Sequence, residues 1–177
     1  KRILNIHGSI IEGGVGFGGG LMTWAQLSTI MEPTNHTRRI IGFDTFAGFP
    51  SVSKHDTAYP GMMKVDSQAE IEACVKLYDQ NRFVGHIPKV ELVKGDATKT
   101  IPQYIQDNPH LVVSLLYLDF DIYDPTAVAI QSLLNRMPQG AIIAFDELNM
   151  REWPGETIAA LLMLNQRTSK LERCAFG

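Results

Sequence analysis

The sequence has few cysteines, little net charge and no long apolar run, and each of these absences narrows the class of protein. Its 177 residues include two cysteines, Cys74 and Cys174, in no spacing typical of a zinc site. We expect both to be small buried thiols in a reducing compartment. The formal net charge of -3 offers no sequence-independent attraction to nucleic acid.

No apolar run is long enough to cross a bilayer, and no secretory signal opens the sequence. The composition therefore predicts a cytoplasmic protein that binds neither membranes nor nucleic acids. Apolar residues make up 45% of the chain, enough to fill one core at this length. We expect residues 1–177 to form a single domain.

Short apolar runs alternate with helical stretches along the chain. The runs that we expect to be strands are 9–12, 40–44, 90–94, 111–119 and 141–146, with a sixth candidate at 171–176. Helices are expected at 19–30, from Ser67 with a capping box to Glu70, at 98–108, from Asp124 as N-cap, and at 154–165. This alternation predicts an α/β fold, with a doubly wound, mostly parallel sheet between two helical layers.

The segment 47–66 differs from the rest because it contains prolines and glycines but few periodic apolar residues. Loops of this length without structure of their own are often lids over a site. We expect it to lie beside the ligand site, and an ordinary surface excursion is the alternative.

Six glycines fall between Gly13 and Gly20, after the first expected strand and before a helix. Glycines in this place let the backbone approach a ligand and free amide donors at the helix start. Gly14, Gly16 and Gly19 also fit the G-x-G-x-x-G pattern of dinucleotide-binding proteins, which alone is weak. Glu12 precedes them, and its carboxylate suits the ammonium group of S-adenosylmethionine better than a pyrophosphate. Glu12 can also act at the helix start, where negative charge is favourable.

Two further acids follow expected strands. Asp44 ends the second expected strand and can accept hydrogen bonds from ribose hydroxyls, whether the cofactor is a dinucleotide or S-adenosylmethionine. Asp96 follows the third and can contact the adenine end of a cofactor or cap the next helix.

Four carboxylates follow the fourth and fifth expected strands: Asp119, Asp121, Asp146 and Glu147. Carboxyl ends of neighbouring parallel strands meet at one edge of a sheet, so we expect these acids to converge. Converging carboxylates repel one another unless a cation neutralises them, and Mg²⁺ prefers oxygen ligands. We assign Asp119, Asp146 and Glu147 as metal ligands and Asp121 as the general base that takes a hydroxyl proton. Loop and cap acids without a joint function are the alternative.

Several strings resemble motifs of macrocin O-methyltransferase-like enzymes, a family of class I sugar O-methyltransferases. Ile11–Gly19 resembles the first motif, and Gly42–Pro50 resembles the second and more specific one. Leu118–Tyr123 and Phe145–Glu147 resemble the metal-binding strand ends, and Trp153–Gly155 a later tryptophan-glycine element.

The resemblance implies a Rossmann-like fold, S-adenosylmethionine, Mg²⁺, and a base at the second aspartate of the Asp-x-Asp pair. Gly16 and Phe17 stand where the family has bulky or basic residues, and Glu147 replaces an aspartate. The family also has N-terminal helices and a seventh, antiparallel strand, and we find no counterpart of either in this sequence. An exposed sheet edge would follow, so we expect absent residues or a homo-oligomer.

Together these features predict a metal-dependent O-methyltransferase that acts on a small-molecule hydroxyl, in line with the family on a sugar of an antibiotic or other natural product. The cofactor-binding residues that we expect are Glu12, Gly13, Gly14, Val15, Gly18, Asp44, Thr45, Phe46, Gly95, Asp96, Ala97 and Asp119. An NAD-dependent oxidoreductase is one alternative, although it leaves the four acids unexplained. A non-catalytic cofactor-binding module is the other.

Overall fold

A computed structural model describes residues 1–164 and 170–173 of the chain. Its centre is a sheet of five parallel strands: β1 (Ser9–Gly13), β2 (Ile40–Asp44), β3 (Val90–Lys94), β4 (Val113–Leu118) and β5 (Ile142–Phe145). Their order is β3-β2-β1-β4-β5. From β1 the chain first adds β2 and β3 on one side, and it then crosses back to place β4 and β5 on the other side of β1. The predicted doubly wound α/β fold is confirmed.

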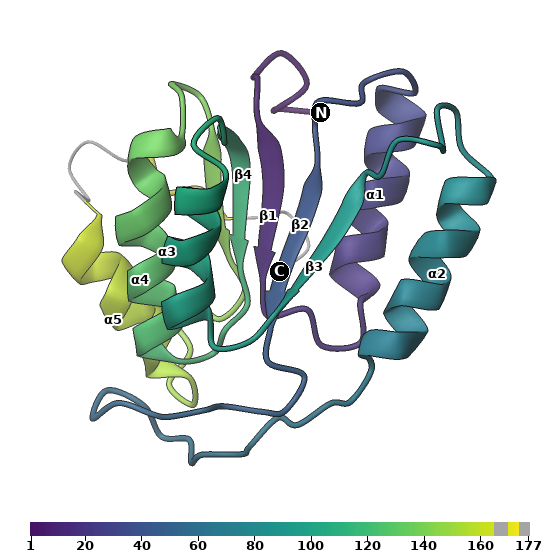
Figure 1. Cartoon of the computed structure of the whole chain (residues 1–177). Coiled ribbons are helices and arrows are strands. Elements are labelled where there is room, and N and C mark those ends of the chain that lie inside the picture. Colours follow the sequence, from purple (N-terminus) through teal and green to yellow (C-terminus); the bar gives the residue numbers. More distant parts are fainter. Residues whose placement is uncertain (165–169, 174–177) are drawn as a thin grey trace.

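Helices cover both faces of the sheet, as Figure 1 shows. The helices α1 (Gly19–Met31) and α2 (Gln68–Gln80) lie on one face. The other face is covered by α3 (Ala97–Asp107), α4 (Tyr123–Leu133) and α5 (Pro154–Met163), and a short 3₁₀ turn, Leu134–Arg136, extends α4. The architecture therefore has the three layers expected from the sequence.

The strand residues alternate between two apolar cores because successive side chains point to opposite faces of a strand. Ile10 of β1 and Leu115 of β4 belong to the core beside α1. Ile11 and Leu116, their direct neighbours, belong to the core beside α3 and α4. Both faces of the central strands are buried, which explains why their sequences read as nearly continuous apolar runs.

The long loop after β2 runs below the carboxyl ends of the strands before the chain enters α2 (Figure 1). Two of its polar groups attach it to the segments around the starts of α4 and α5. The Thr57 hydroxyl donates to the Glu152 carbonyl, and the Asp56 carboxylate accepts from the Tyr123 backbone N–H at 2.8 Å. The loop is therefore held at the sheet edge where ligands bind in open α/β folds.

Several local predictions were wrong. Ser67 is the N-cap of α2, but its hydroxyl donates to the Gly16 carbonyl and not to the helix, so no capping box forms. Asp124 is not an N-cap, because α4 begins at Tyr123 and Asp124 lies in its first turn. Cys74 is exposed rather than buried.

The remaining differences concern the C-terminal part of the chain and the ends of elements. The sixth strand expected at 171–176 is not seen at residues 170–173, and the rest of it lies outside the described residues, as does Cys174. The last helix is described to Met163, short of the predicted end at 165. Within the part of the chain that the structure describes, every helix is too short or too polar to cross a membrane.

Candidate active site

The glycine loop and the first acid of the Asp-x-Asp pair meet at the centre of the sheet, where the strand order reverses. The Asp119 backbone N–H donates to the Gly13 carbonyl at 2.8 Å, which continues the β1–β4 ladder by one bond. A Cβ atom on Gly14 would lie 1.8 Å from the Asp119 carbonyl oxygen. Gly14 also has φ +82, a conformation that favours glycine. Both the close approach of Asp119 and this backbone conformation therefore require a glycine at position 14.

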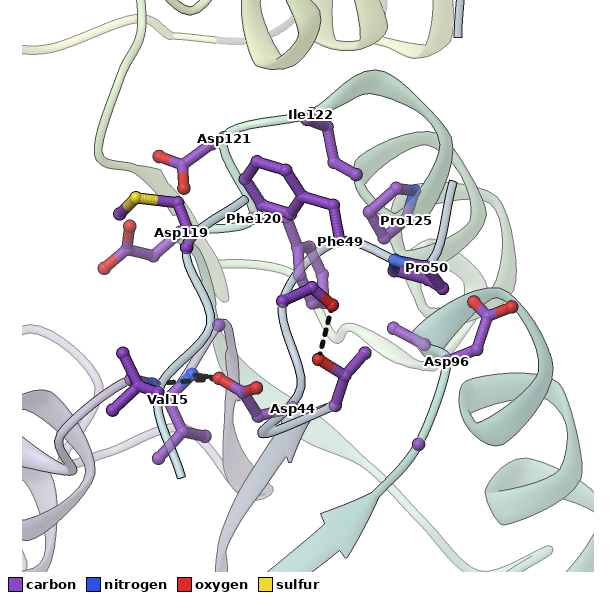
Figure 2. A pocket seen from close by; sticks show the side chains of 18 of the residues that line it. Val15, Asp44, Phe49, Pro50, Asp96, Asp119, Phe120, Asp121, Ile122 and Pro125 are labelled. Carbon is purple, nitrogen blue, oxygen red and sulfur yellow. Dashed lines mark hydrogen bonds between the residues drawn. The ribbon is translucent and has the colours of Figure 1, made fainter. Parts of the chain in front are cut away.

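Asp44 fixes the shape of the glycine loop. One carboxylate oxygen accepts hydrogen bonds from the backbone N–H groups of Val15 and Gly16, at 2.7 and 2.9 Å. The other oxygen accepts from the Phe46 N–H at 2.7 Å. Figure 2 shows the Asp44 carboxylate turned toward Val15. An acid at the end of β2 therefore orders the loop, whatever further bonds it makes to a ligand.

A cavity of about 300 Å³ opens beside this loop, at the carboxyl ends of the strands. The volume is at the lower end of the range of small-molecule pockets, roughly 300–1,000 Å³. Its walls come from the glycine loop, the ends of β2, β3 and β4, and the long loop 45–66. The lining residues predicted from the sequence are Gly14, Val15, Asp44, Thr45, Gly95, Asp96, Ala97, Asp119 and Asp121.

Other predicted site residues do not line this cavity: Glu12, Gly13, Gly18, Phe46, Asp146 and Glu147. Gly13 lies against the Phe120 ring, Gly18 against Ile71, and Phe46 is buried in the core. Gly16 and Phe17, the positions that depart from the family pattern, do line it, and the Phe17 side chain is 83% exposed. The loop 45–66 contributes Phe49, Pro50 and Met63, as expected of a segment beside the site.

Asp96 performs one of the two roles that the sequence left open, the capping of the next helix, and it also faces the cavity. Its carboxylate caps α3 by accepting from the Thr98 backbone N–H at 3.0 Å, and it also lines the cavity. Burial opposes ionisation of Asp96, but the hydrogen bonds from Thr98, together with the Lys99 ammonium, outweigh it and lower the pKa of the carboxyl. Figure 2 shows Asp96 on the opposite side of the cavity from Asp119 and Asp121.

Glu12 lies beneath the glycine loop rather than in the cavity. Its side chain is buried against α1, where a Cβ atom on Gly20 would lie 2.7 Å from a carboxylate oxygen. The other oxygen, Oε2, has no hydrogen-bond partner. Burial, with the nearby Asp119 carboxylate, raises the pKa of Glu12 to about 8. A buried acid with an unpartnered oxygen at this position is a candidate for a cationic ligand group.

The second group of predicted residues converges as expected. One carboxylate oxygen each from Asp119, Asp146 and Glu147 lies within 4.8 Å of the other two. Sheet pairing explains the proximity: the Asp146 N–H donates to the Leu118 carbonyl at 3.1 Å, so β4 and β5 end side by side. The Tyr117 hydroxyl donates to Asp146 at 2.7 Å and orients that side chain.

The charges of these acids are incompatible with one another in the absence of a cation. Burial and the carboxylates of Asp146 and Asp121 raise the pKa of Asp119 to about 7. Burial, followed by the charge of Asp121, raises the pKa of Glu147 to about 8. The Glu147 Oε2 atom is buried without a partner. Three oxygen donors, raised pKa values and an unpartnered oxygen together fit a divalent cation such as Mg²⁺.

Asp121 stands next to this group and faces the cavity. Since β4 ends at Leu118, Asp121 lies beyond the strand, where its backbone has φ 63, a conformation uncommon for residues other than glycine. Burial raises the pKa of its carboxyl to about 6, and the Asp146 carboxylate adds to the effect. Figure 2 shows the carboxylates of Asp119 and Asp121 close together on one wall.

Three polar residues that hold the site in place were missed in the sequence: Asp56, Tyr117 and Glu156. Asp56 reaches the first residue of α4 from the long loop, and Tyr117 reaches Asp146 from β4. Glu156, in the first turn of α5, accepts from the Phe120 N–H at 3.0 Å. An acid in the first turn of a helix is common for reasons of charge alone, so no signal marked Glu156 as buried.

The sheet order, the cavity at the switch point and the acids at the ends of β4 and β5 define a Rossmann-like α/β fold of the methyltransferase type. The model of the macrocin-O-methyltransferase (TylF) family matches residues 2–170. The chain belongs to this family, as its motifs indicated. No match was found among curated protein sequences.

Solved structures agree with the family assignment. A crystal structure of the calicheamicin methyltransferase CalS11 superposes with a TM-score of 0.94 at 37% identity, covering 98% of this chain and 70% of that one. An apo structure of CalS11, described as a TDP-rhamnose 3'-O-methyltransferase of calicheamicin biosynthesis, gives 0.84 at 35% identity and the same coverage. The O-methyltransferase NovP gives 0.69 at 20% identity, covering 88% of this chain and 62% of that one, and shares the fold.

Proposed function

We propose that the chain is an S-adenosylmethionine-dependent and Mg²⁺-dependent O-methyltransferase that methylates a sugar hydroxyl in natural product biosynthesis. The observation that carries the proposal is the convergence of Asp119, Asp146 and Glu147 within 4.8 Å, next to Asp121 and the cavity. Family membership supports the methyl transfer and does not support the NAD-dependent oxidoreductase that the glycine pattern alone left open.

The cavity suits S-adenosylmethionine, which supplies an electrophilic methyl group on a sulfonium. Gly14 and Val15 would bring their backbone against the ligand, since no side chain can stand at Gly14. Asp44 offers lone pairs toward ribose hydroxyls while it holds the loop, and Asp96 and Ala97 form the opposite wall. From its buried place beneath the glycine loop, an ionised Glu12 would attract the positive charge of the amino acid end.

Asp119, Asp146 and Glu147 would hold the cation, which lowers the pKa of a nearby hydroxyl by its charge. Asp121 is the base: one oxygen of its carboxylate accepts the proton that the acceptor hydroxyl loses. That hydroxyl oxygen forms the new bond to the methyl carbon as the bond from carbon to sulfur breaks. A pKa of about 6 keeps Asp121 mostly ionised near neutral pH and still basic enough for this transfer.

Aromatic side chains form the wall on which an acceptor would rest. Phe49, from the long loop, lines the cavity and packs edge-on against Trp153, with ring centroids 6.2 Å apart. Phe120, between the two aspartates of the pair, lines it as well. Apolar rings at this point exclude water from the methyl group and offer a flat surface to a sugar ring.

TDP-rhamnose is the first acceptor to test, because CalS11 is described as its 3'-O-methyltransferase. The protein would be incubated with S-adenosylmethionine and TDP-rhamnose, and the sugar nucleotide analysed by mass spectrometry. We expect product with Mg²⁺, none with EDTA, and recovery when Mg²⁺ is returned in excess. Methylation at an unchanged rate in EDTA would exclude the metal, and no methylation of any sugar nucleotide would argue against the acceptor class.

Two proposals concern the setting of the enzyme. We infer a cytoplasmic enzyme, in keeping with its biosynthetic relatives. We also infer a homo-oligomer, because β5 ends the described sheet and its residues are only half-buried. Sedimentation equilibrium tests the second proposal, and a monomer at micromolar concentration would exclude it.

A further inference from the structure

Three consecutive residues in the first turn of α5 contact the segments that carry the acids. A Cβ atom on Gly155 would lie 2.2 Å from the Asp56 carboxylate and 2.5 Å from the Tyr123 nitrogen. The Thr157 hydroxyl accepts from the Asn149 N–H at 2.7 Å. Glu156 lies between these two residues and is 0% exposed. The turn thus contacts the start of α4, the loop after β5 and the long loop together.

Glu156 connects the two acid-bearing segments through one carboxylate. Its Oε1 accepts from the Phe120 N–H at 3.0 Å, and its Oε2 accepts from the Glu147 N–H at 3.3 Å. Phe120 separates Asp119 from Asp121, and Glu147 directly follows Asp146. The two hydrogen bonds therefore join the segments that carry all four acids.

The backbone around Asp121 depends on external support. Its left-handed conformation, φ 63, carries a cost that surrounding contacts must offset. Glu156 holds the N–H just before Asp121, and Asp56 holds the N–H two residues after it, at Tyr123. The backbone on both sides of Asp121 is therefore held by carboxylates from distant segments.

An amide side chain cannot replace Glu156 without loss of one of its two hydrogen bonds. A carboxylate offers acceptor lone pairs on both oxygens, so it can receive two N–H groups at once. A glutamine offers one acceptor and turns an NH₂ donor toward the other N–H.

We propose that Glu156 is a positioning residue that sets the spacing of the metal ligands by joining the Phe120 and Glu147 backbone amides. This inference rests on the proposed metal-dependent function. Partners that orient metal ligands typically change metal affinity by about 10–100-fold when they are removed. Glu156 touches neither the cavity nor a ligand oxygen, so its effect acts through the two backbone segments.

The test measures how tightly the purified, substrate-free protein binds Mn²⁺. Electron paramagnetic resonance gives the concentration of free Mn²⁺ in the titration, and Mg²⁺ is then added as a competitor. Glu156→Gln is expected to weaken Mn²⁺ binding about 10–100-fold, with affinity for S-adenosylhomocysteine within about threefold of the wild type by calorimetry. The control is Ala159→Gly, which loosens the same helix at a buried position three residues after Glu156 and removes no hydrogen-bonding side chain. The control should bind Mn²⁺ as the wild type does.

The outcomes separate this inference from the proposed function. Equal Mn²⁺ affinity of wild type and Glu156→Gln, or equal weakening by Ala159→Gly, overturns the positioning role and leaves the enzyme assignment intact. A wild type that binds no Mn²⁺ overturns the proposed metal site, and the positioning role with it. If Glu156→Gln does not fold, hydrogen exchange of the metal-free wild type decides. The Phe120 and Glu147 amides should be protected, and rapid exchange of both overturns the inference.

Discussion

The Asp56 carboxylate accepts a hydrogen bond from the Tyr123 backbone N–H at 2.8 Å, although the two residues are 67 positions apart. Tyr123 is the first residue of α4, so an acid from the long loop performs the capping that a local residue usually provides. Its other oxygen accepts from the Ser53 N–H at 2.8 Å. One side chain thereby stabilises α4 and shapes the loop that lines the cavity.

Replacing Asp56 by alanine should affect both stability and turnover. Loss of a capping bond costs about 1 kcal/mol of unfolding free energy, measured by urea denaturation. Turnover should fall further, about tenfold, because a 1 Å misplacement of catalytic groups costs up to roughly 10²-fold. The matched control is Asp124→Ala, which removes an acid in the first turn of α4 and leaves the bond from Tyr123 to Asp56 in place. Similar losses in both variants would show that charge, and not the bond, is responsible.

Gly14 and Gly16 offer a steric test of the glycine loop. Both have positive φ, but a Cβ on Gly14 would meet the Asp119 carbonyl at 1.8 Å, whereas one on Gly16 meets nothing within 4 Å. Gly16→Ala should cost only the conformational strain, about 1–2 kcal/mol. Gly14→Ala should cost clearly more and weaken S-adenosylhomocysteine binding by at least tenfold in calorimetry. Equal stability of the two variants would contradict the close approach of β1 and β4.

Replacing Glu12 by glutamine should raise the stability of the protein and weaken its binding of the cofactor. Its pKa is raised to about 8, so the folded state keeps it protonated where the unfolded chain is ionised. Its contribution to stability is therefore greatest below about pH 4.5 and is lost as pH rises to about 8. Glu12→Gln resembles the protonated form and should stabilise the cofactor-free protein at pH 8 by roughly 1–3 kcal/mol.

The same substitution should weaken the binding of S-adenosylhomocysteine at pH 8, because the charge opposite the ammonium group is lost. Thermal unfolding at pH 5 and pH 8 and calorimetry at pH 8 check the two parts. The stability difference should nearly vanish at the lower pH. If Glu12→Gln is less stable than the wild type at pH 8, the Oε2 atom of Glu12 has a partner in solution that the structure does not show.

Asp121→Asn should remove the base and leave binding in place. General bases typically contribute about 10²–10⁴-fold to rate, so turnover should fall by that factor. Affinity for S-adenosylhomocysteine should stay within a few-fold, since Asp121 does not shape the glycine loop. Asp124→Asn, three residues further on, is the control and should turn over normally. Normal turnover by Asp121→Asn would reject Asp121 as the base.

The sheet and the acid cluster could be predicted from the sequence because both follow from strand ends. Apolar runs such as 113–118 mark buried parallel strands, and acids directly after them must gather at one edge. Asp119, Asp146 and Glu147 were found in this way, and the family motifs pointed to the same residues. Helix 19–31 was found from its glycines and apolar spacing with an error of one residue.

Contacts between distant segments could not be predicted in this way. Nothing local distinguishes Asp56 from other polar loop residues, and its partner is a backbone N–H that every residue carries. The capping box predicted at Ser67 was wrong for the same reason, because the Ser67 hydroxyl donates to the Gly16 carbonyl in another segment and not to its own helix. Pattern reasoning assigns such side chains to the nearest helix end, whereas the folded chain offers partners from any direction.

The pairing of β4 with β1 determines how early the ligand site can form while the protein is being synthesised. Ser9 and Ser114 are in contact although they lie 105 positions apart, so the centre of the sheet cannot close before the chain has been synthesised beyond Ser114. Such long-range contacts slow folding and come late. A fluorescent analogue of the methyl donor, added to ribosome-bound chains of increasing length, should therefore bind only once the residues that line the pocket, from Gly14 to Pro125, have all left the ribosome.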